Sequence, residues 1–208
     1  MSKGRISKEG APEQSFDQCA MPARPQGAAV PLTPETMADS VGQSMVSIAP
    51  GKRRLTIVTG GQTGVDRAAL DIALDLKLPI RGWCPLGRAA EDGPIDARYP
   101  LQECSSANPA VRTELNAIES DGTLLLSHGS HHTDGTNLTR ERALAHGRPL
   151  LELSLDDPAF PEKFWSWIRE KDIRALNVAG PRESQATDGR GIYDPARQVL
   201  RQLLDPSS

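Results

Sequence analysis

The stretch LTIVTGGQTGVDRAALDIALDL, residues 55–76, carries the strongest structural signal in the chain. Its first five residues, Leu55–Thr59, form a β-branched, apolar run that is typical of a buried strand. The turn Gly60–Gly64 then interrupts the strand. Apolar side chains recur after it at helical spacing, at Val65, Ala68, Ala69, Ile72, Ala73 and Leu76. Strand, glycine-rich turn and helix together predict the opening of a βαβ unit.

The turn comprises Gly60, Gly61, Gln62, Thr63 and Gly64, and it is a candidate anion site. Backbone N–H groups and the dipole at the start of a helix favour a negative charge. The pattern Gly-Gly-x-x-Gly is neither the dinucleotide fingerprint nor the Walker loop, so a tight packing turn without a ligand is the alternative. Gln62 and Thr63 favour the ligand interpretation because they add hydrogen-bonding groups. Asp66 either favours the helix dipole or bonds a ligand hydroxyl or ring edge.

Composition limits the classes of function. The chain has 208 residues, a net charge of −3 and a pI near 5.8, which gives no basic face for nucleic acid. No apolar run approaches the ~20 residues of a membrane span, and the first residues lack the apolar core of a signal peptide. Three scattered cysteines argue against a disulfide framework and a structural zinc. These features predict a cytoplasmic protein without a metal site.

The first 50 residues differ from the rest. They contain six prolines, one aromatic residue (Phe16) and no sustained periodicity. Such a composition predicts a disordered N-terminal arm over residues 1–50, followed by one folded domain over residues 51–208.

The remaining elements alternate along the chain. Strands are predicted at 80–83, 99–103, 122–127, 149–153 and 174–179, and helices at 109–119, 137–146, 161–171 and 195–204. The alternation predicts an α/β, Rossmann-like doubly wound fold, with a mainly parallel sheet and helices on both faces. The segment 85–94 holds too much proline and glycine for a regular element, and is predicted to be a loop.

Polar, glycine-bearing turns follow three of the predicted strands, at 60–64, 128–136 and 180–184. In parallel sheets, ligands bind beyond the carboxyl ends of the strands, so we expect a ligand site on this rim. In the second turn, Gly135 would let the backbone approach a ligand and Thr136 would cap the helix, although a capped helix without a ligand explains both residues as well. The third turn contributes Gly180, Pro181 and Arg182 to the predicted site.

Charged side chains near these turns are candidates for contact with a ligand. Arg88, Arg112 and Arg182 could clamp an anion, since arginine binds phosphate bidentately, or could be solvated surface charges. Arg182 is favoured because it belongs to a rim turn. His128, His131 and His132 indicate a hydrated or phosphate-facing loop rather than a metal site, because the last two are adjacent and no cysteine is near. If the protein is a catalyst, Glu91, Asp92 or Glu183 would be its acid or base.

Four motifs are similar to those of the putative molybdenum carrier family. They are GGQTGVDRAALD at 60–71, GWCP at 82–85, GRAAEDG at 87–93 and AGPRES at 179–184. That family resembles the molybdenum cofactor carrier proteins and belongs with the Rossmann-like domains that include the Lonely-Guy phosphoribohydrolases. The resemblance covers residues 54–204. It implies a cytosolic, oligomeric protein that holds the phosphorylated pterin cofactor, or a related nucleotide, by its phosphate and ring.

One departure bears on activity. Lonely-Guy enzymes place glutamates two and three residues after a Gly-Thr pair, whereas Gly135-Thr136 is followed there by Leu138 and Thr139. We therefore interpret the chain as a molybdenum cofactor carrier that binds a phosphorylated small molecule. The alternatives are a nucleotide-processing hydrolase and a nucleotide-sensing regulatory domain. A homo-oligomer is predicted, with helix 109–119 or helix 137–146 at the interface.

Overall fold

The computed structural model describes residues 54–128, 133–156, 161–187 and 189–205. The predicted arm at 1–50, His131 and His132 lie outside the described residues. No helix in the described ranges is both long and apolar enough to cross a membrane.

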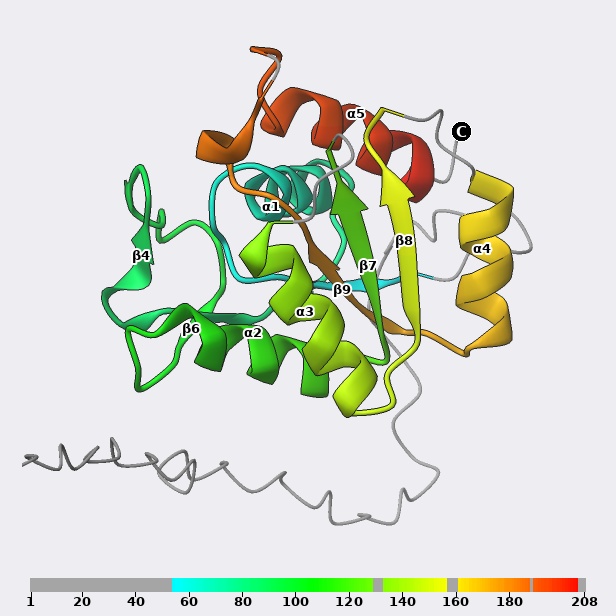
Figure 1. Ribbon diagram of the computed structural model, residues 1–208. Helices are drawn as coiled ribbons and strands as arrows, with labels where there is room; N and C mark the ends of the chain where they lie inside the picture. Colours follow the sequence, from blue (N-terminus) through cyan, green and yellow to red (C-terminus); the bar gives the residue numbers. More distant parts are fainter. Residues whose placement is uncertain (1–53, 129–132, 157–160, 188, 206–208) are drawn as a thin grey trace, which may run out of the picture. The chain divides into compact units, whose positions relative to one another are not determined.

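A five-stranded sheet forms the centre of the fold, in the order β2-β1-β9-β7-β8 (Figure 1). Every pairing in this sheet is parallel. Its strands are β1 (Thr56–Val58), β2 (Ile80–Arg81), β7 (Gly122–Ser127), β8 (Leu150–Ser154) and β9 (Ala175–Ala179). The predicted Rossmann-like fold is confirmed.

The last strand of the sheet in chain order, β9, lies between the first, β1, and the third, β7. If β9 and the helix that follows it preceded β1, the strand order would become 3-2-1-4-5, the order of a Rossmann sheet. The turn after β9 therefore has the place that the phosphate-binding turn has in Rossmann folds. The topological switch point, where ligands bind, falls between β9 and β7.

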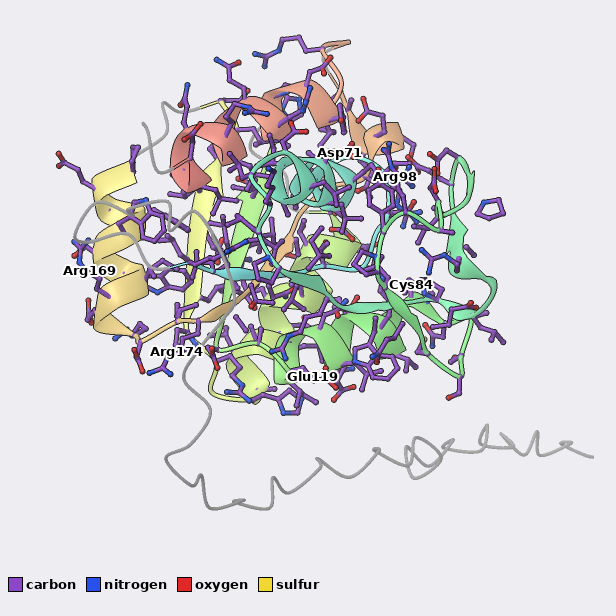
Figure 2. The ribbon with its side chains drawn as sticks, turned by 180° about the vertical axis from the view of Figure 1, so that it is seen from behind. Asp71, Cys84, Arg98, Glu119, Arg169 and Arg174 are labelled. Atoms are coloured by element: carbon purple, nitrogen blue, oxygen red, sulfur yellow. The ribbon has the colours of Figure 1, made fainter. Side chains whose placement is uncertain are left out.

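Helices cover both faces of the sheet. The helices are α1 (Val65–Asp75), α2 (Pro109–Ile118), α3 (Asp134–Ala145), α4 (Pro161–Glu170) and α5 (Tyr193–Leu204). Helix α1 packs beside α5 on one face, and α2 beside α3 on the other, as the opposite views in Figures 1 and 2 show.

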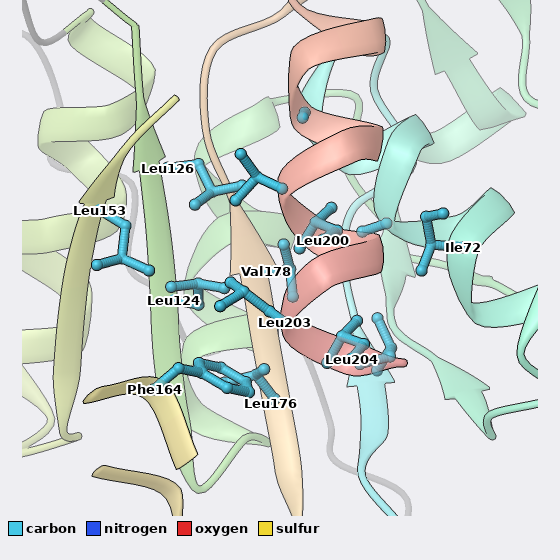
Figure 3. Packing of buried hydrophobic residues seen from close by; sticks show 14 of the residues in the cluster. Ile72, Leu124, Leu126, Leu153, Phe164, Leu176, Val178, Leu200, Leu203 and Leu204 are labelled. Carbon is cyan, nitrogen blue, oxygen red and sulfur yellow. The ribbon is translucent and has the colours of Figure 1, made fainter. Parts of the chain in front are cut away.

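The main hydrophobic core fills the face covered by α1, α4 and α5 (Figure 3). Alternate residues of each strand point into this core, such as Leu124 and Leu126 of β7, and Leu200 of α5 belongs to the same cluster. Burying a side chain of this kind contributes about 1.5–3 kcal/mol. The face under α2 and α3 buries fewer large apolar side chains: beside Val58 and Leu125 it buries small and polar ones, namely Thr113, Asn116, Ala117, Thr123, Thr139, Ala143 and Asn177.

The predicted strand 80–83 is wrong as a single element. Gly82 breaks it with a φ of 145°, and a Cβ at this position would lie 2.9 Å from the backbone nitrogen of Thr59. Residues after the break form β3 (Trp83–Cys84), which pairs with β6 (Gln102–Glu103) in a separate two-stranded sheet.

The predicted loop 85–94 is also more regular than its composition indicates. It contains a short 3-10 turn, η1 (Leu86–Arg88), and a small hairpin of β4 (Ala89–Ala90) and β5 (Gly93–Pro94). We call residues 89–94 the hairpin. Its two strands pair with each other across Glu91 and Asp92, but each is only two residues long and so leaves no periodicity in the sequence.

Thr136 does not cap α3, contrary to the prediction. The helix starts at Asp134, and the cap is Thr133, whose side-chain oxygen accepts a hydrogen bond from the backbone N–H of Thr136 at 3.3 Å. The sequence offers two threonines at positions three apart, and either one satisfies the local preference for a cap.

Candidate functional site

The turns after β1 and β9 touch at the carboxyl edge of the sheet. The backbone N–H of Val65 donates to the Pro181 carbonyl at 3.2 Å. Gly64, with a φ of 71°, lies so close that a Cβ there would be 2.5 Å from the same carbonyl oxygen. Gly64 therefore allows the two turns to pack together. Such close packing is the alternative to a role in ligand binding for this turn.

Glu91 of the hairpin ties these two turns together. Its carboxylate accepts hydrogen bonds from the Thr63 hydroxyl, from the Ser184 N–H at 3.0 Å and from the Ser184 hydroxyl at 2.6 Å. Its own N–H donates to the side-chain oxygen of Gln62 at 2.9 Å. Burial raises the pKa of Glu91, but the hydrogen bonds from Ser184 and Thr63 outweigh it and the pKa is lowered.

A buried ion pair lies beneath the first turn. Asp66 is only 4% exposed, and it accepts hydrogen bonds from the Gln62 N–H at 3.3 Å and from Arg112 Nη1 at 3.1 Å. Burial raises the pKa of Asp66, against the opposing effect of the Arg112 charge. Gly60 makes room for the guanidinium, because a Cβ at Gly60 would lie 2.6 Å from Arg112 Cζ. Within the described residues, Arg112 Nε is buried without a hydrogen-bond partner.

A cavity of about 260 Å³ opens beside this ion pair, and we call it the arginine cavity. Arg112 and Arg182 both line it, and helix α2 begins at its edge with Pro109. The described residues that line it are Gly60, Gln62, Pro85, Ala89, Ala90, Glu91, Ala107, Pro109, Arg112 and Arg182. Two guanidinium groups and the positive end of a helix make this a site that favours anions.

A second cavity, of about 590 Å³, lies on the other side of Glu91, and we call it the acidic cavity. The described residues that line it are Thr63, Gly64, Arg67, Glu91, Asp92, Glu183, Ser184 and Tyr193. Arg67 forms a bidentate ion pair with Asp92, at 3.1 and 3.2 Å. Three carboxylates surround the single arginine, so the charge balance is the reverse of that in the arginine cavity.

Glu183 and Tyr193, which both line the acidic cavity, are fixed by hydrogen bonds. The Glu183 carboxylate accepts the backbone N–H groups of Ile192 and Tyr193, at 3.1 and 2.8 Å, and so caps α5 from outside the helix. The Tyr193 hydroxyl donates a hydrogen bond to Asp71 at 2.7 Å. Burial is the largest cause, and this hydrogen bond the second, of a rise in the pKa of Tyr193 to about 12. Figure 2 shows Arg98 next to Asp71, which it also contacts at 3.0 Å.

Several predicted site residues occupy other places. Arg88 donates to the carbonyls of Ile95, Asp96, Tyr99 and Leu101, at 2.8–3.1 Å, and so braces the segment that follows the hairpin. A Cβ at Gly61 would meet Leu101 at 2.6 Å, so this glycine packs against the same segment. Gly135 and Thr136 lie in the first turn of α3 and are not among the described residues that line either cavity.

The other predicted residues come together around the two cavities. The predicted residues that line a cavity, or pair with a residue that does, are Gly60, Gln62, Thr63, Gly64, Asp66, Arg182, Glu91, Asp92 and Glu183. Gly180 and Pro181 lie in the turn behind Gly64, where a Cβ at Gly180 would be 2.7 Å from the carbonyl oxygen of Leu126.

Sequence reasoning missed Arg67, Ser184 and Tyr193 as lining residues. Tyr193 precedes the helix start predicted at 195, and Arg67 looks like a solvated position of α1. The only local signal for Ser184 is its place at the end of a rim turn.

Sheet, helices and rim cavities define a Rossmann-like α/β protein whose first strand has moved to the end of the chain. The chain belongs to the circularly permutated YpsA SLOG family, which matches residues 57–204. This membership agrees with the position of β9 at the centre of the sheet.

One solved structure is similar to this chain over most of its folded part. It is the crystal structure of a "putative molybdenum carrier protein" from Syntrophus aciditrophicus SB, with 39% sequence identity and a TM-score of 0.66. The alignment covers 73% of this chain and 96% of that chain. A search of the curated proteins gave no match. The resemblance to molybdenum carriers that the four motifs indicate is confirmed.

Proposed function

We propose that this protein binds a phosphorylated cofactor, with the phosphate in the arginine cavity. The ligand class is a phosphorylated pterin, such as the molybdenum cofactor, or a related nucleotide. The observation that supports this best is that Arg112 and Arg182, from α2 and from the turn after β9, line one cavity at the carboxyl edge of the sheet. The description of the similar structure as a molybdenum carrier supports the same class.

The electrostatics of the cavity fit a phosphate. Asp66 neutralises one guanidinium through Arg112 Nη1, but Arg112 Nε has no hydrogen-bond partner within the described residues. Arg182 is exposed and lies near enough to Glu91 to lower the pKa of that carboxyl. A dianionic group entering between the two guanidinium groups would form charge-assisted hydrogen bonds, which are stronger than neutral ones.

Binding without turnover is the favoured interpretation because the candidate acids hold other groups. Glu91 accepts hydrogen bonds from two residues of the rim turns, Glu183 caps α5, and Asp92 forms a bidentate ion pair with Arg67. A general base must reach the proton that it removes, and a carboxylate already bonded to backbone N–H groups is poorly placed for this. A carrier holding its cargo by the phosphate and ring needs no such base. Molybdenum would then arrive as part of the cargo.

Two measurements test the proposal. Mass spectrometry of small molecules released from natively purified protein should detect a phosphorylated pterin or nucleotide. Calorimetric titration with inorganic phosphate should show weaker binding by Arg112→Ala and by Arg182→Ala, by about 1.5–3 kcal/mol each, the range for a hydrogen bond to a charged group. The control is Arg174→Ala, whose side chain is 75% exposed and lies at the opposite end of the sheet from Asp71 and Arg98 (Figure 2).

Two results would contradict the proposal. One is phosphate binding that both cavity variants retain at wild-type strength. The other is release of free base from nucleoside monophosphates, lost on substitution of Glu91, Asp92 or Glu183, which would favour the hydrolase alternative.

A further inference from the structure

The acidic cavity has the opposite chemistry to the arginine cavity, although the two share a wall. Glu91 lines both cavities. On the acidic side, Glu91, Asp92 and Glu183 face one arginine, Arg67. A phosphate would be repelled there, whereas a neutral group rich in N–H donors would find acceptors.

Asp92 is the carboxylate best able to accept such donors. Glu91 already accepts the Ser184 N–H and hydroxyl, and Glu183 accepts the backbone N–H groups of Ile192 and Tyr193 at the start of α5. The side chain of Asp92 is 50% exposed, and each of its oxygens accepts one N–H of Arg67, at 3.1 and 3.2 Å. An ionised carboxylate offers about four lone-pair sites, so further acceptor capacity remains on Asp92.

Arg67 holds Asp92 in a defined position. Its Nε and Nη2 atoms both donate to the Gly61 carbonyl, at 3.4 and 3.3 Å, and its guanidinium lies 5.7 Å from the centre of the Tyr99 ring. The carboxylate of Asp92 is therefore presented by a side chain that α1 and the first rim turn anchor. Such an arrangement is preorganised, which limits the entropy lost on binding.

The sizes of the cavities divide a ligand into two parts. The arginine cavity, at about 260 Å³, is small for a whole nucleotide, whereas the acidic cavity, at about 590 Å³, lies within the range of small-molecule sites. A ligand with its phosphate beside Arg182 would extend past Glu91 into the larger space.

We propose that the acidic cavity binds a heterocycle of the 2-amino-4-oxo class, the ring edge that guanine and pterin share. Asp92 accepts a hydrogen bond from the 2-amino N–H on a lone pair that the bidentate pair with Arg67 leaves open. Asp92 thereby selects rings that carry the 2-amino group over rings that lack it. The inference rests on the proposed function for the position of the phosphate, but the choice of ring depends on Asp92 alone.

Calorimetry with ligand pairs that differ only in the 2-amino group tests the ring site. Wild-type protein should bind GMP at least about tenfold more tightly than IMP, since IMP would leave an acceptor of a charged group unpaired. Asp92→Asn should reduce this preference below about threefold and leave the affinity for inorganic phosphate within about twofold of wild type. Glu170→Gln, which removes a 66% exposed carboxylate on α4, should keep the preference.

Further arms separate the ring site from the phosphate site. Guanosine and inosine carry no phosphate, so a preference for guanosine that Asp92→Asn abolishes supports the ring site even if inorganic phosphate fails to bind. A pterin monophosphate should compete with GMP for wild-type protein. The ligand that binds more tightly shows whether the natural ring is a pterin or a guanine. Equal affinities for GMP and IMP in wild type, or a preference that survives in folded Asp92→Asn, would overturn the inference.

Discussion

Arg112 reaches across from α2 to donate a hydrogen bond to Asp66 on α1, at 3.1 Å, and it passes directly over Gly60. The glycine is thus required by a side chain from another helix. A glycine in a phosphate-binding turn usually allows the backbone to approach the ligand. Here Gly60 also determines where a candidate phosphate-binding arginine can lie.

Gly60→Ala should weaken the binding of inorganic phosphate about as much as Arg112→Ala does. The new Cβ would displace the guanidinium, which is the end of a flexible side chain, and leave the backbone in place. The double variant should bind phosphate no more weakly than Arg112→Ala, because both substitutions remove the same contact. Calorimetry on the three variants measures this, and additive losses would show that Gly60 acts on the ligand independently.

Gly135→Ala is the matched control for that experiment. The nearest atom to its Cβ would be Thr133 Oγ1 at 3.9 Å, so the methyl group fits. Alanine in a helix is more favourable than glycine by about 0.5–1 kcal/mol, and the variant should be as stable as wild type or slightly more stable. Loss of phosphate binding here would place the start of α3 in the site, as the sequence indicates.

Arg88→Lys should lower the free energy of unfolding by about 2–4 kcal/mol. Arg88 donates to four carbonyls, and a lysine ammonium cannot reach all of them, so buried acceptors would lose their partners. Urea unfolding measures the loss. Phosphate affinity should stay near that of wild type in the folded variant. A stable variant with weakened phosphate binding would instead support the role of anion clamp that the sequence indicates for Arg88.

Glu91→Gln should reveal a stability term that depends on pH. Because the folded-state pKa of Glu91 lies below its ordinary value of 4.5, its contribution is fully present above pH 4.5 and is lost as the pH falls through the lowered pKa. The difference in unfolding free energy between wild type and Glu91→Gln should therefore shrink from pH 6 to pH 3. Urea unfolding across this range measures it, with Glu170→Gln as control. A difference that is constant with pH would contradict the assignment.

Leu144→Glu should dissociate the predicted homo-oligomer if α3 forms the interface. Leu144 is 61% exposed on α3, and a two-fold interface would bury the same residue of both subunits. Light scattering should give a smaller mass for this variant than for wild type. Leu86→Glu changes a 52% exposed leucine in η1 and should leave the mass unchanged. A monomer mass for wild type at every concentration would contradict the predicted assembly.

The helices and long strands could be predicted because their signals are local. Helix α1 shows its apolar stripe within its own residues, and Asn108, directly before α2, caps that helix by accepting a hydrogen bond from the Ala110 N–H at 3.0 Å. The run of apolar residues in β7 is continuous, which is typical of a strand buried on both faces. In each case the residues that make the pattern are also the residues that form the element.

The start of α5 shows where this local reasoning fails. The helix begins at Tyr193, two residues before the predicted start, because the carboxylate of Glu183 accepts its first N–H groups from outside the helix. There, a residue distant in the chain satisfies backbone groups that the local sequence leaves open. The hairpin was missed for another reason, because its strands pair locally but are only two residues long.

By itself, the sequence determined the alternation of strands and helices, the glycine-rich turns and a resemblance to molybdenum carriers. Its periodicity could not place β9 between β1 and β7, because strand order depends on how the whole set of apolar faces packs. The candidate site follows from that order. Asp66 and Arg112 are 46 residues apart, and Glu91 meets Ser184 across 93 residues. Tertiary packing brings these charges together, and it also uses Arg88 to brace the backbone while leaving Arg112 and Arg182 facing one cavity.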